Sequence, residues 1–369
     1  METHIVRQPA RSPWTRHATD ASRIRSRGAW RGLLCTTAVG LACCVGPSEG
    51  VTPSRPRLTS VSTRPDYVTG GDVLVRVSVP RATPRESWSV RLDGQEQAVV
   101  FRAEPQSGPA GVDGVDTLLG LVTTLSDGPH RLELWLGSSL ADTLELTSHP
   151  RSGPVFSGPH QSPFLCQTRE NLMGEPRDAS CSAPTRVSYV YRTTEPPEAG
   201  EPDVEAARRR LRDPAQLPPG FKPLDPDAPR PADVARLTLR SGAAVDYIVR
   251  RERGTLNRAV YEIAFLHSPG EPLPEPGVGT PGWNGRLVYV FGGGCAAGYR
   301  QGILAGALHE ELLQQGYAVA ASSLNVFGNT CDDVISAETA MMVKEHFIEA
   351  FGPPLHTIGS GGSGGAMQQ

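Results

Sequence analysis

The chain has 369 residues, of which 38% are hydrophobic and 20% are charged, and its formal net charge is −3. This length accommodates two domains and a targeting segment, and the composition is typical of a soluble globular protein rather than a membrane bundle. The slightly acidic chain with scattered basic residues offers no electrostatic basis for nucleic-acid binding. We expect its short basic runs, at residues 208–210 and 250–251, to be solvent-exposed.

Residues 1–48 have the pattern of an export signal. Seven arginines between positions 7 and 31 precede an apolar run at 32–42, which is too short to span a bilayer and has the length of a signal-peptide core. Ala42 and Cys43 resemble a bacterial lipoprotein cleavage site, so lipidation at Cys43 or Cys44 and simple secretion both remain open. We expect a secreted protein, or one of the periplasm or cell envelope, that meets a membrane only through such a lipid anchor.

Four further cysteines lie beyond this segment: Cys166, Cys181, Cys295 and Cys331. An even number in an exported protein predicts disulfide bonds. Sequence proximity favours Cys166–Cys181 and Cys295–Cys331 among the three pairings, although spacing alone does not decide. A zinc site is the weaker interpretation because no CxxC or HxxxH pair is present, and we expect neither a metal nor another cofactor.

Residues 52–150 have the pattern of a small all-β domain. Alternating apolar and polar residues at 72–79, 87–92 and 130–136 are separated by turn sequences, which suggests an immunoglobulin-like sandwich. Its predicted role is docking, spacing or substrate binding, and a structural spacer is favoured. A region rich in Gly, Pro and Ser follows, and we place the domain boundary near residues 152–154. The proline-rich stretch 195–231 is expected to be a surface excursion.

Residues 155–369 alternate buried-type strands with helices, which favours an α/β domain with a mostly parallel sheet. The helix at 332–351 is expected to pack through apolar side chains. The predicted strands are 237–240, 246–250, 258–266, 286–291, 317–321 and 355–358, the predicted helices are 303–315 and 332–351, and the apolar contacts of the second helix are Val334, Ala337, Met341, Val343 and Phe347.

The last strand leads into Gly361-Gly362-Ser363-Gly364-Gly365, which fits the GxSxG pattern of a nucleophile elbow. Small flanking residues let the chain bend sharply around the serine, and the following helix directs its N–H groups at a developing oxyanion. Ser360 does not fit, because Ile358 occupies the first glycine position. A flexible Gly/Ser linker is the alternative, but the preceding strand and long helix favour the elbow.

A second glycine-rich segment, Phe291-Gly292-Gly293-Gly294-Cys295, directly follows a predicted strand. It is similar to the HGGG-type loop of esterases, whose backbone N–H groups bind the substrate's carbonyl oxygen. A tight turn is the alternative, although a turn requires one glycine rather than three. Gly293 and Gly294 are therefore candidate oxyanion-hole residues.

Five segments together resemble a family of uncharacterised bacterial secreted proteins, which is itself similar to the tannase and feruloyl-esterase branch of α/β-hydrolases. These segments are residues 282–288, 291–295, 322–329, 337–340 and 361–365, and the resemblance covers roughly residues 155–369. It implies an α/β-hydrolase fold and ester hydrolysis by a Ser-His-Asp triad, with Ser363 as nucleophile and Gly364, Gly293 and Gly294 forming the oxyanion hole. Tannases carry a cysteine just before the serine, where this chain has Gly362, so the resemblance does not define the substrate.

In this fold the acid and the histidine follow the serine along the chain, yet only six residues follow Ser363 and none is Asp, Glu or His. We do not expect His267, His309, His346 or His356 to act as the base. The sequence thus predicts an incomplete hydrolase sheet, poor solubility and no turnover by these 369 residues alone. A non-catalytic binding or surface protein with a relic hydrolase domain is the alternative, and acyl transfer or amide hydrolysis is a third. The ester and the oligomeric state are not predicted.

Overall fold

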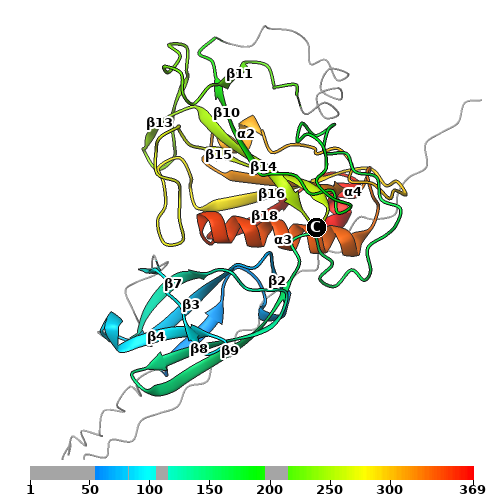
Figure 1. The fold of residues 1–369 in the computed structure, drawn as a ribbon. Helices are drawn as coiled ribbons and strands as arrows, with labels where there is room; N and C mark the ends of the chain where they lie inside the picture. Colours follow the sequence, from blue (N-terminus) through cyan, green and yellow to red (C-terminus); the bar gives the residue numbers. More distant parts are fainter. Residues whose placement is uncertain (1–54, 82, 105–114, 196–214) are drawn as a thin grey trace, which may run out of the picture. The chain divides into compact units, whose positions relative to one another are not determined.

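The computed structural model describes residues 55–81, 83–104, 115–195 and 215–369. The predicted export signal, with Cys43 and Cys44, and the basic run at 208–210 lie outside the described residues. Among the described residues, 40% are in strands and 12% in helices. The molecule is therefore built mainly from β-sheets (Figure 1).

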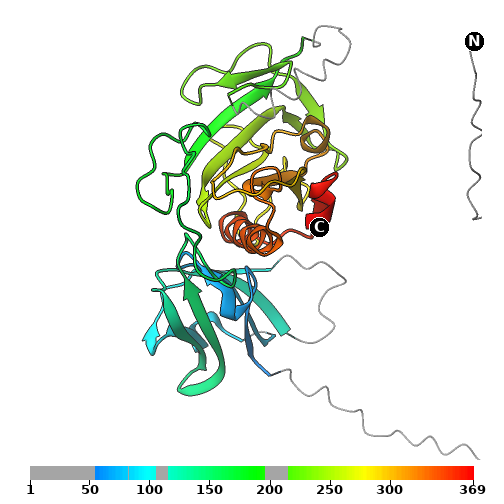
Figure 2. The ribbon, with the colours of Figure 1, turned by 90° about the vertical axis from the view of Figure 1, so that its right-hand side faces the viewer.

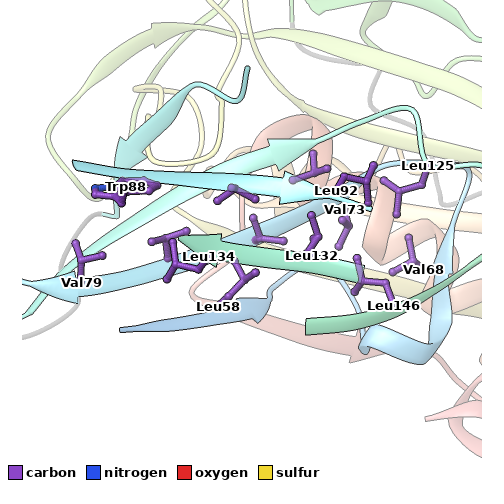
Figure 3. Close-up of a cluster of buried hydrophobic side chains, with 14 residues drawn as sticks. Leu58, Val68, Val73, Val79, Trp88, Leu92, Leu125, Leu132, Leu134 and Leu146 are labelled. Carbon is purple, nitrogen blue, oxygen red and sulfur yellow. The ribbon is translucent and has the colours of Figure 1, made fainter. Parts of the chain in front are cut away.

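Two sheets from the first part of the chain pack around one apolar core. Their inward side chains include Trp88, whose ring lies edge-on to Phe101 with centroids 4.9 Å apart, and Figure 3 shows these side chains between the strands. The strands of the first sheet follow the order β1 (Arg57–Ser60), β3 (Val73–Pro80), β7 (Val115–Val122), β6 (Phe101–Ala103). The strands of the second sheet follow the order β2 (Val68–Thr69), β9 (Ser139–His149), β8 (Gly128–Leu136), β4 (Trp88–Leu92), β5 (Gln95–Glu96). Two short 3-10 helices, Pro65–Tyr67 and Arg85–Ser87, lie in connections between the two sheets.

A seven-stranded mixed sheet organises the rest of the chain. Its order is β11 (Phe221–Leu224), β10 (Arg186–Arg192), β14 (Ile248–Leu256), β15 (Ala259–Leu266), β17 (Ala318–Val326), β16 (Arg286–Gly292), β18 (His356–Ser360). Only the β17–β16 and β16–β18 pairs are parallel, and the other four pairs are antiparallel. A separate two-stranded sheet pairs β12 (Arg236–Thr238) with β13 (Ala244–Asp246).

The expectation of an α/β-hydrolase-type, mostly parallel sheet is therefore wrong. β14 and β15 are joined by only Asn257 and Arg258, both with positive φ, and such a two-residue turn can connect only antiparallel strands. The segment 258–266 contains a strand as predicted, and every residue of this strand is buried, but burial does not fix the direction of its neighbours. The short strand β11 also lies within the stretch predicted to be irregular.

Helix α3 (Asp333–Phe351) packs against one face of this sheet, as Figure 2 shows with the helix seen end-on. Val343 and Phe347 contribute to its buried face as predicted, but Val334 and Ala337 are exposed, and Glu338, Glu345 and Glu349 are buried instead. The helix predicted at 303–315 is limited to α2 (Glu310–Leu313), which adds Leu313 to the core on the other face. The last helix, α4 (Gly364–Gln368), follows β18.

The basic pair Arg250 and Arg251 is buried in β14, contrary to the prediction of a solvated surface. Arg251 and Arg253 lie 2.7 and 3.0 Å from a carboxylate oxygen of Glu262, which is fully buried on the neighbouring strand β15. Burial alone would raise the pKa of Glu262, but the two guanidinium groups outweigh it and lower that pKa below its usual value. The charged run is thus an internal ion cluster that holds the β14–β15 hairpin.

Buried carboxyl groups also lie where α3 meets the first β-sheets. Glu345 accepts hydrogen bonds from the backbone N–H of Thr69, at 2.9 Å, and from the Thr69 hydroxyl. Burial raises the pKa of Glu345 above its ordinary value, and burial together with the neighbouring Glu345 charge raises that of Glu349. Burial likewise raises the pKa of Asp72. Glu345 and Glu349 thus favour the protonated form in the folded state.

We predict that this cluster makes the folded state less stable as pH rises. A group whose pKa is higher in the folded than in the unfolded state stabilises the fold at low pH. As the pH rises from the unfolded pKa to the folded pKa, each such group reduces the free energy of unfolding by up to about 1.4 kcal/mol per pH unit. Urea unfolding measured from weakly acidic to weakly alkaline pH should therefore show a smaller decline in Glu345→Gln than in the parent. Glu145→Gln, at a side chain that is 73% exposed, is the control and should keep the parental slope. Equal slopes in Glu345→Gln and the parent would contradict the prediction.

Candidate active site

Ser363 occupies the sharp turn between β18 and α4. Its backbone has φ 56° and ψ −124°, a conformation that non-glycine residues rarely adopt and that costs on the order of 1–3 kcal/mol. Its side chain is exposed to solvent. A strained serine between a strand and a helix is the geometry of a nucleophile elbow.

The glycines around Ser363 are required by close backbone contacts. A Cβ atom at Gly361 would lie 2.7 Å from the carbonyl oxygen of Phe291, and one at Gly365 would lie 2.4 Å from the same oxygen. A Cβ at Gly364 would lie 2.0 Å from the carbonyl oxygen of Gly294. The turn therefore packs directly against the backbone at the end of β16 and just after it.

The two glycine-rich motifs identified in the sequence are thus brought together. A Cβ built on Gly293 would lie 3.6 Å from the Cβ of Ser363, and Gly294 has a φ of 94° that favours glycine. In the described part of the chain, no acceptor is found for the N–H groups of Gly293, Gly294 or Gly364. Three backbone N–H groups beside Ser363 are therefore unbonded within the described residues; Gly293 and Gly294 are exposed, whereas Gly364 is buried.

Backbone bonds and a disulfide hold the Gly293–Gly294 loop. Gly328 donates its N–H to the carbonyl of Gly293 at 2.9 Å, and the next residue after the loop, Cys295, is bonded to Cys331 just before α3. The second disulfide joins Cys166 to Cys181. These are the two pairings that sequence proximity favours, and they indicate an extracellular or periplasmic protein. None of the helices in the described ranges is long and apolar enough to cross a bilayer.

Gln368, which the sequence analysis missed, links the elbow helix to the loop. Its side-chain amide donates to the carbonyl of Gly292 at 2.9 Å and to that of Gly364 at 3.2 Å, and its Oε1 accepts from the Ser336 hydroxyl at 2.7 Å. The buried Asn325 side chain in turn donates to Ser336. No local sequence pattern marks Gln368. Apart from Gly364 in its own helix, its partners lie at least 32 residues away along the chain.

The structure brings none of the four excluded histidines into a hydrogen bond with Ser363, within the residues it describes. They lie elsewhere: His346 on α3 bonded to Glu252 and Tyr261, His267 beside the Pro272 carbonyl, His309 at the start of α2, and His356 at the start of β18. Nor do the described residues contain a cluster of three His, Cys, Asp or Glu side chains that could hold a metal ion.

A cavity of about 450 Å³ lies beside the elbow, between β16, β18, α3 and α4. Phe291, Met341, Lys344 and Gln368 are among the side chains that line it, but Ser363 is not. The serine instead faces solvent beside the exposed Gly293 and Gly294.

The close contact at Gly364 gives a testable prediction. Gly364→Ala would place a Cβ 2.0 Å from the carbonyl oxygen of Gly294, so the elbow or the loop must move, and we expect the free energy of unfolding to fall by about 1–3 kcal/mol. Gly362→Ala is the matched control, because a Cβ there meets no atom within 4 Å. Chemical denaturation of the two variants measures the difference. Equal stability of both variants would show that the contact is not a close one.

Comparisons with known proteins agree with the tannase-like resemblance of the sequence. A sequence model of the tannase-like family of unknown function DUF6351 matches residues 58–369, and no curated protein matches the chain. Among solved structures, the Lin-41 filamin domain is 12% identical, with 26% of this chain and 98% of that chain covered and a TM-score of 0.18. The mouse nectin-like molecule 4 ectodomain is 13% identical, with 60% of this chain and 67% of that one covered, also at a TM-score of 0.18. Neither structural likeness is close enough to carry an argument, whereas the family match spans most of the sequence. The chain belongs to the tannase-like family of unknown function.

Proposed function

We propose that the protein is an exported hydrolase of carboxylic esters with Ser363 as its nucleophile. The observation that carries the proposal is the strained, exposed serine placed beside three unbonded backbone N–H groups. Membership of a tannase-like family supports ester chemistry. The two disulfides and the signal-like pattern of residues 1–48 support export.

The arrangement would support acyl transfer in two steps. The hydroxyl oxygen of Ser363 attacks the ester carbonyl carbon, and the carbonyl oxygen becomes an oxyanion that accepts from the N–H of Gly364 and from the Gly293–Gly294 loop. Collapse of this intermediate breaks the bond to the alcohol, which leaves with a proton, and an acyl-serine remains. Water then hydrolyses the acyl-serine and releases the acid.

Both steps require a base that takes the proton from Ser363 or from water. In elbow-type hydrolases a histidine and a carboxylate beyond the nucleophile supply it. No histidine in the described ranges is hydrogen-bonded to Ser363, so we assign the base to none of them.

We predict that Ser363→Ala lowers kcat/KM for an aryl ester by at least about a thousandfold, because removal of the nucleophile leaves only the oxyanion donors and binding. Ser360→Ala is the matched control: Ser360 is also exposed and lies three residues earlier, but outside the GxSxG pattern. It should change kcat/KM by less than about threefold. Retention of activity in Ser363→Ala would refute the assignment.

Covalent labelling distinguishes an esterase from a binding protein. A fluorophosphonate probe should add to Ser363 alone, which peptide mass spectrometry of the labelled protein would show. A second measurement compares an ester with an amide substrate, and the ester with and without an acceptor alcohol. These comparisons distinguish ester hydrolysis from amide hydrolysis and from acyl transfer. If the protein neither turns over esters nor reacts with the probe, the non-catalytic binding role becomes the better account.

A further inference from the structure

A cavity of about 790 Å³ lies at the end of the mixed sheet opposite the elbow. Its walls are the turn after β12, the segment that leads into β16, and the segment between α2 and β17. β16 begins at this cavity with Arg286 and ends with Gly292 beside the elbow, so a strand of 7 residues separates the two places. At about 3.3 Å per residue, the cavity lies roughly 20 Å from the elbow.

The cavity carries two positive charges and no negative one. Arg240 and Arg286 line it, and its lining includes no Asp or Glu. Within the described ranges, neither guanidinium has a carboxylate oxygen within 4.0 Å or another hydrogen-bond partner. By contrast, Arg230 and Arg236, which lie earlier in the same region, both contact Asp246. The two arginines of the cavity are therefore available to an anionic ligand.

Both arginines are in contact with solvent, since Arg240 is exposed and Arg286 is half-buried. Arg286 and Tyr317 directly precede Leu287 and Ala318, which are paired in the parallel strands β16 and β17. Arg286 and Tyr317 therefore lie side by side at the start of these strands, and both line the cavity. A charged donor and an aromatic ring thus adjoin on one wall.

The other polar walls are uncharged hydroxyl and amide groups. Thr238 and Ser241 belong to the turn after β12, Gln314 and Gln315 follow α2, and all four residues are exposed. The side chain of Gln314 has no partner among the described residues. The side-chain amide of Gln315 donates to the carbonyl of Glu311 at 2.7 Å, which leaves its oxygen free to accept. Such groups both donate and accept hydrogen bonds, as the hydroxyl groups of a sugar do.

Hydrogen bonds between the wall segments fix the shape of the cavity. The N–H of Asn284 donates to the carbonyl of Gly316 at 2.8 Å, and its side-chain amide donates to the carbonyl of Gln315 at 2.9 Å. The Asn284 side-chain oxygen accepts the N–H of Arg286 at 3.0 Å. The indole of Trp283 donates to the carbonyl of Arg286 at 2.9 Å. The backbone that carries Arg286 is thus in place before any ligand arrives, so a ligand does not have to order it.

The chemistry of these walls narrows the class of ligand. The volume falls within the range of roughly 300–1,000 Å³ that is usual for organic ligands, so a small inorganic anion would fill only a fraction of it. A neutral sugar would leave both arginines without a partner, and an aliphatic dicarboxylate would leave the hydroxyl and amide groups without one. A ligand that satisfies both sets of groups carries carboxylates and many hydroxyl groups.

We propose that this cavity binds an acidic oligosaccharide, whose uronic acid carboxylates pair with Arg240 and Arg286. Guanidinium groups suit this role because they bind a carboxylate through two parallel N–H donors. The two disulfides indicate an extracellular or periplasmic protein, and acidic polysaccharides are found in those locations. The site does not rest on the proposed esterase activity.

The test is calorimetric binding, at constant ionic strength, of the β-linked trimer of glucuronic acid. Cellotriose is its neutral counterpart, with hydroxymethyl groups in place of the carboxylates. The parent and Ser363→Ala should both bind the acidic trimer at least about tenfold more tightly than cellotriose. Absence of binding by the acidic trimer, equal affinity for the two trimers, or displacement of the acidic trimer by equimolar inorganic phosphate would each overturn the proposal.

The deciding variant is Arg240→Gln, which should fold normally because the side chain is exposed and has no partner to lose. It should lose at least about fivefold in affinity for the acidic trimer, since one charged donor is removed. Arg57→Gln, which removes an exposed arginine from β1, should retain the parental affinity. Arg286→Gln should lose affinity as Arg240→Gln does, and if it does not fold, Arg240→Gln alone decides. Unchanged affinity in Arg240→Gln would show that the carboxylates bind elsewhere.

Discussion

The candidate site depends on one close approach between two backbone segments, the elbow after β18 and the loop after β16. The approach leaves no room for a side chain at Gly364, whose Cβ would lie 2.0 Å from the carbonyl oxygen of Gly294. It is feasible because β16 and β18 are parallel neighbours, so their carboxyl ends meet at the same sheet edge. The exposure of Ser363 and its nearness to free N–H groups both follow from this contact.

Hydrogen bonds inside the protein keep the two segments in place. Gln368 ties the elbow helix to Gly292 and to Ser336 on α3, and Asn325 on β17 extends the same network to the hydroxyl of Tyr289 at 2.6 Å. Stabilisation of a developing oxyanion requires donors that are already oriented. A network that joins β16, β17, α3 and α4 provides that rigidity from regular elements rather than from the loop itself.

Local features of the site could be predicted from the sequence, whereas its surroundings could not. Ser363, Gly293 and Gly294 are marked by glycines that immediately follow strands, and the structure brings them together. The strand directions could not be predicted, because the apolar run of β15 reports burial alone. The role of Arg251 was also missed: its partner Glu262 lies 11 residues away on another strand. Glu338 and Glu345 were missed for the same reason, since their donors Val155 and Thr69 are 183 and 276 residues distant.

The buried charges of the protein differ in how they are compensated, and this difference singles out Arg258. Glu262 is paired with two arginines, and Glu338 is satisfied by backbone donors. The carboxyl of Glu345 can take up a proton, and burial raises its pKa in that direction. An arginine cannot become neutral in a comparable way, because its guanidinium keeps its proton at any physiological pH. Arg258 is instead compensated without a counter-ion: its guanidinium lies 3.5 Å above the Phe164 ring, and both of its terminal nitrogens donate to the carbonyl of Gln161.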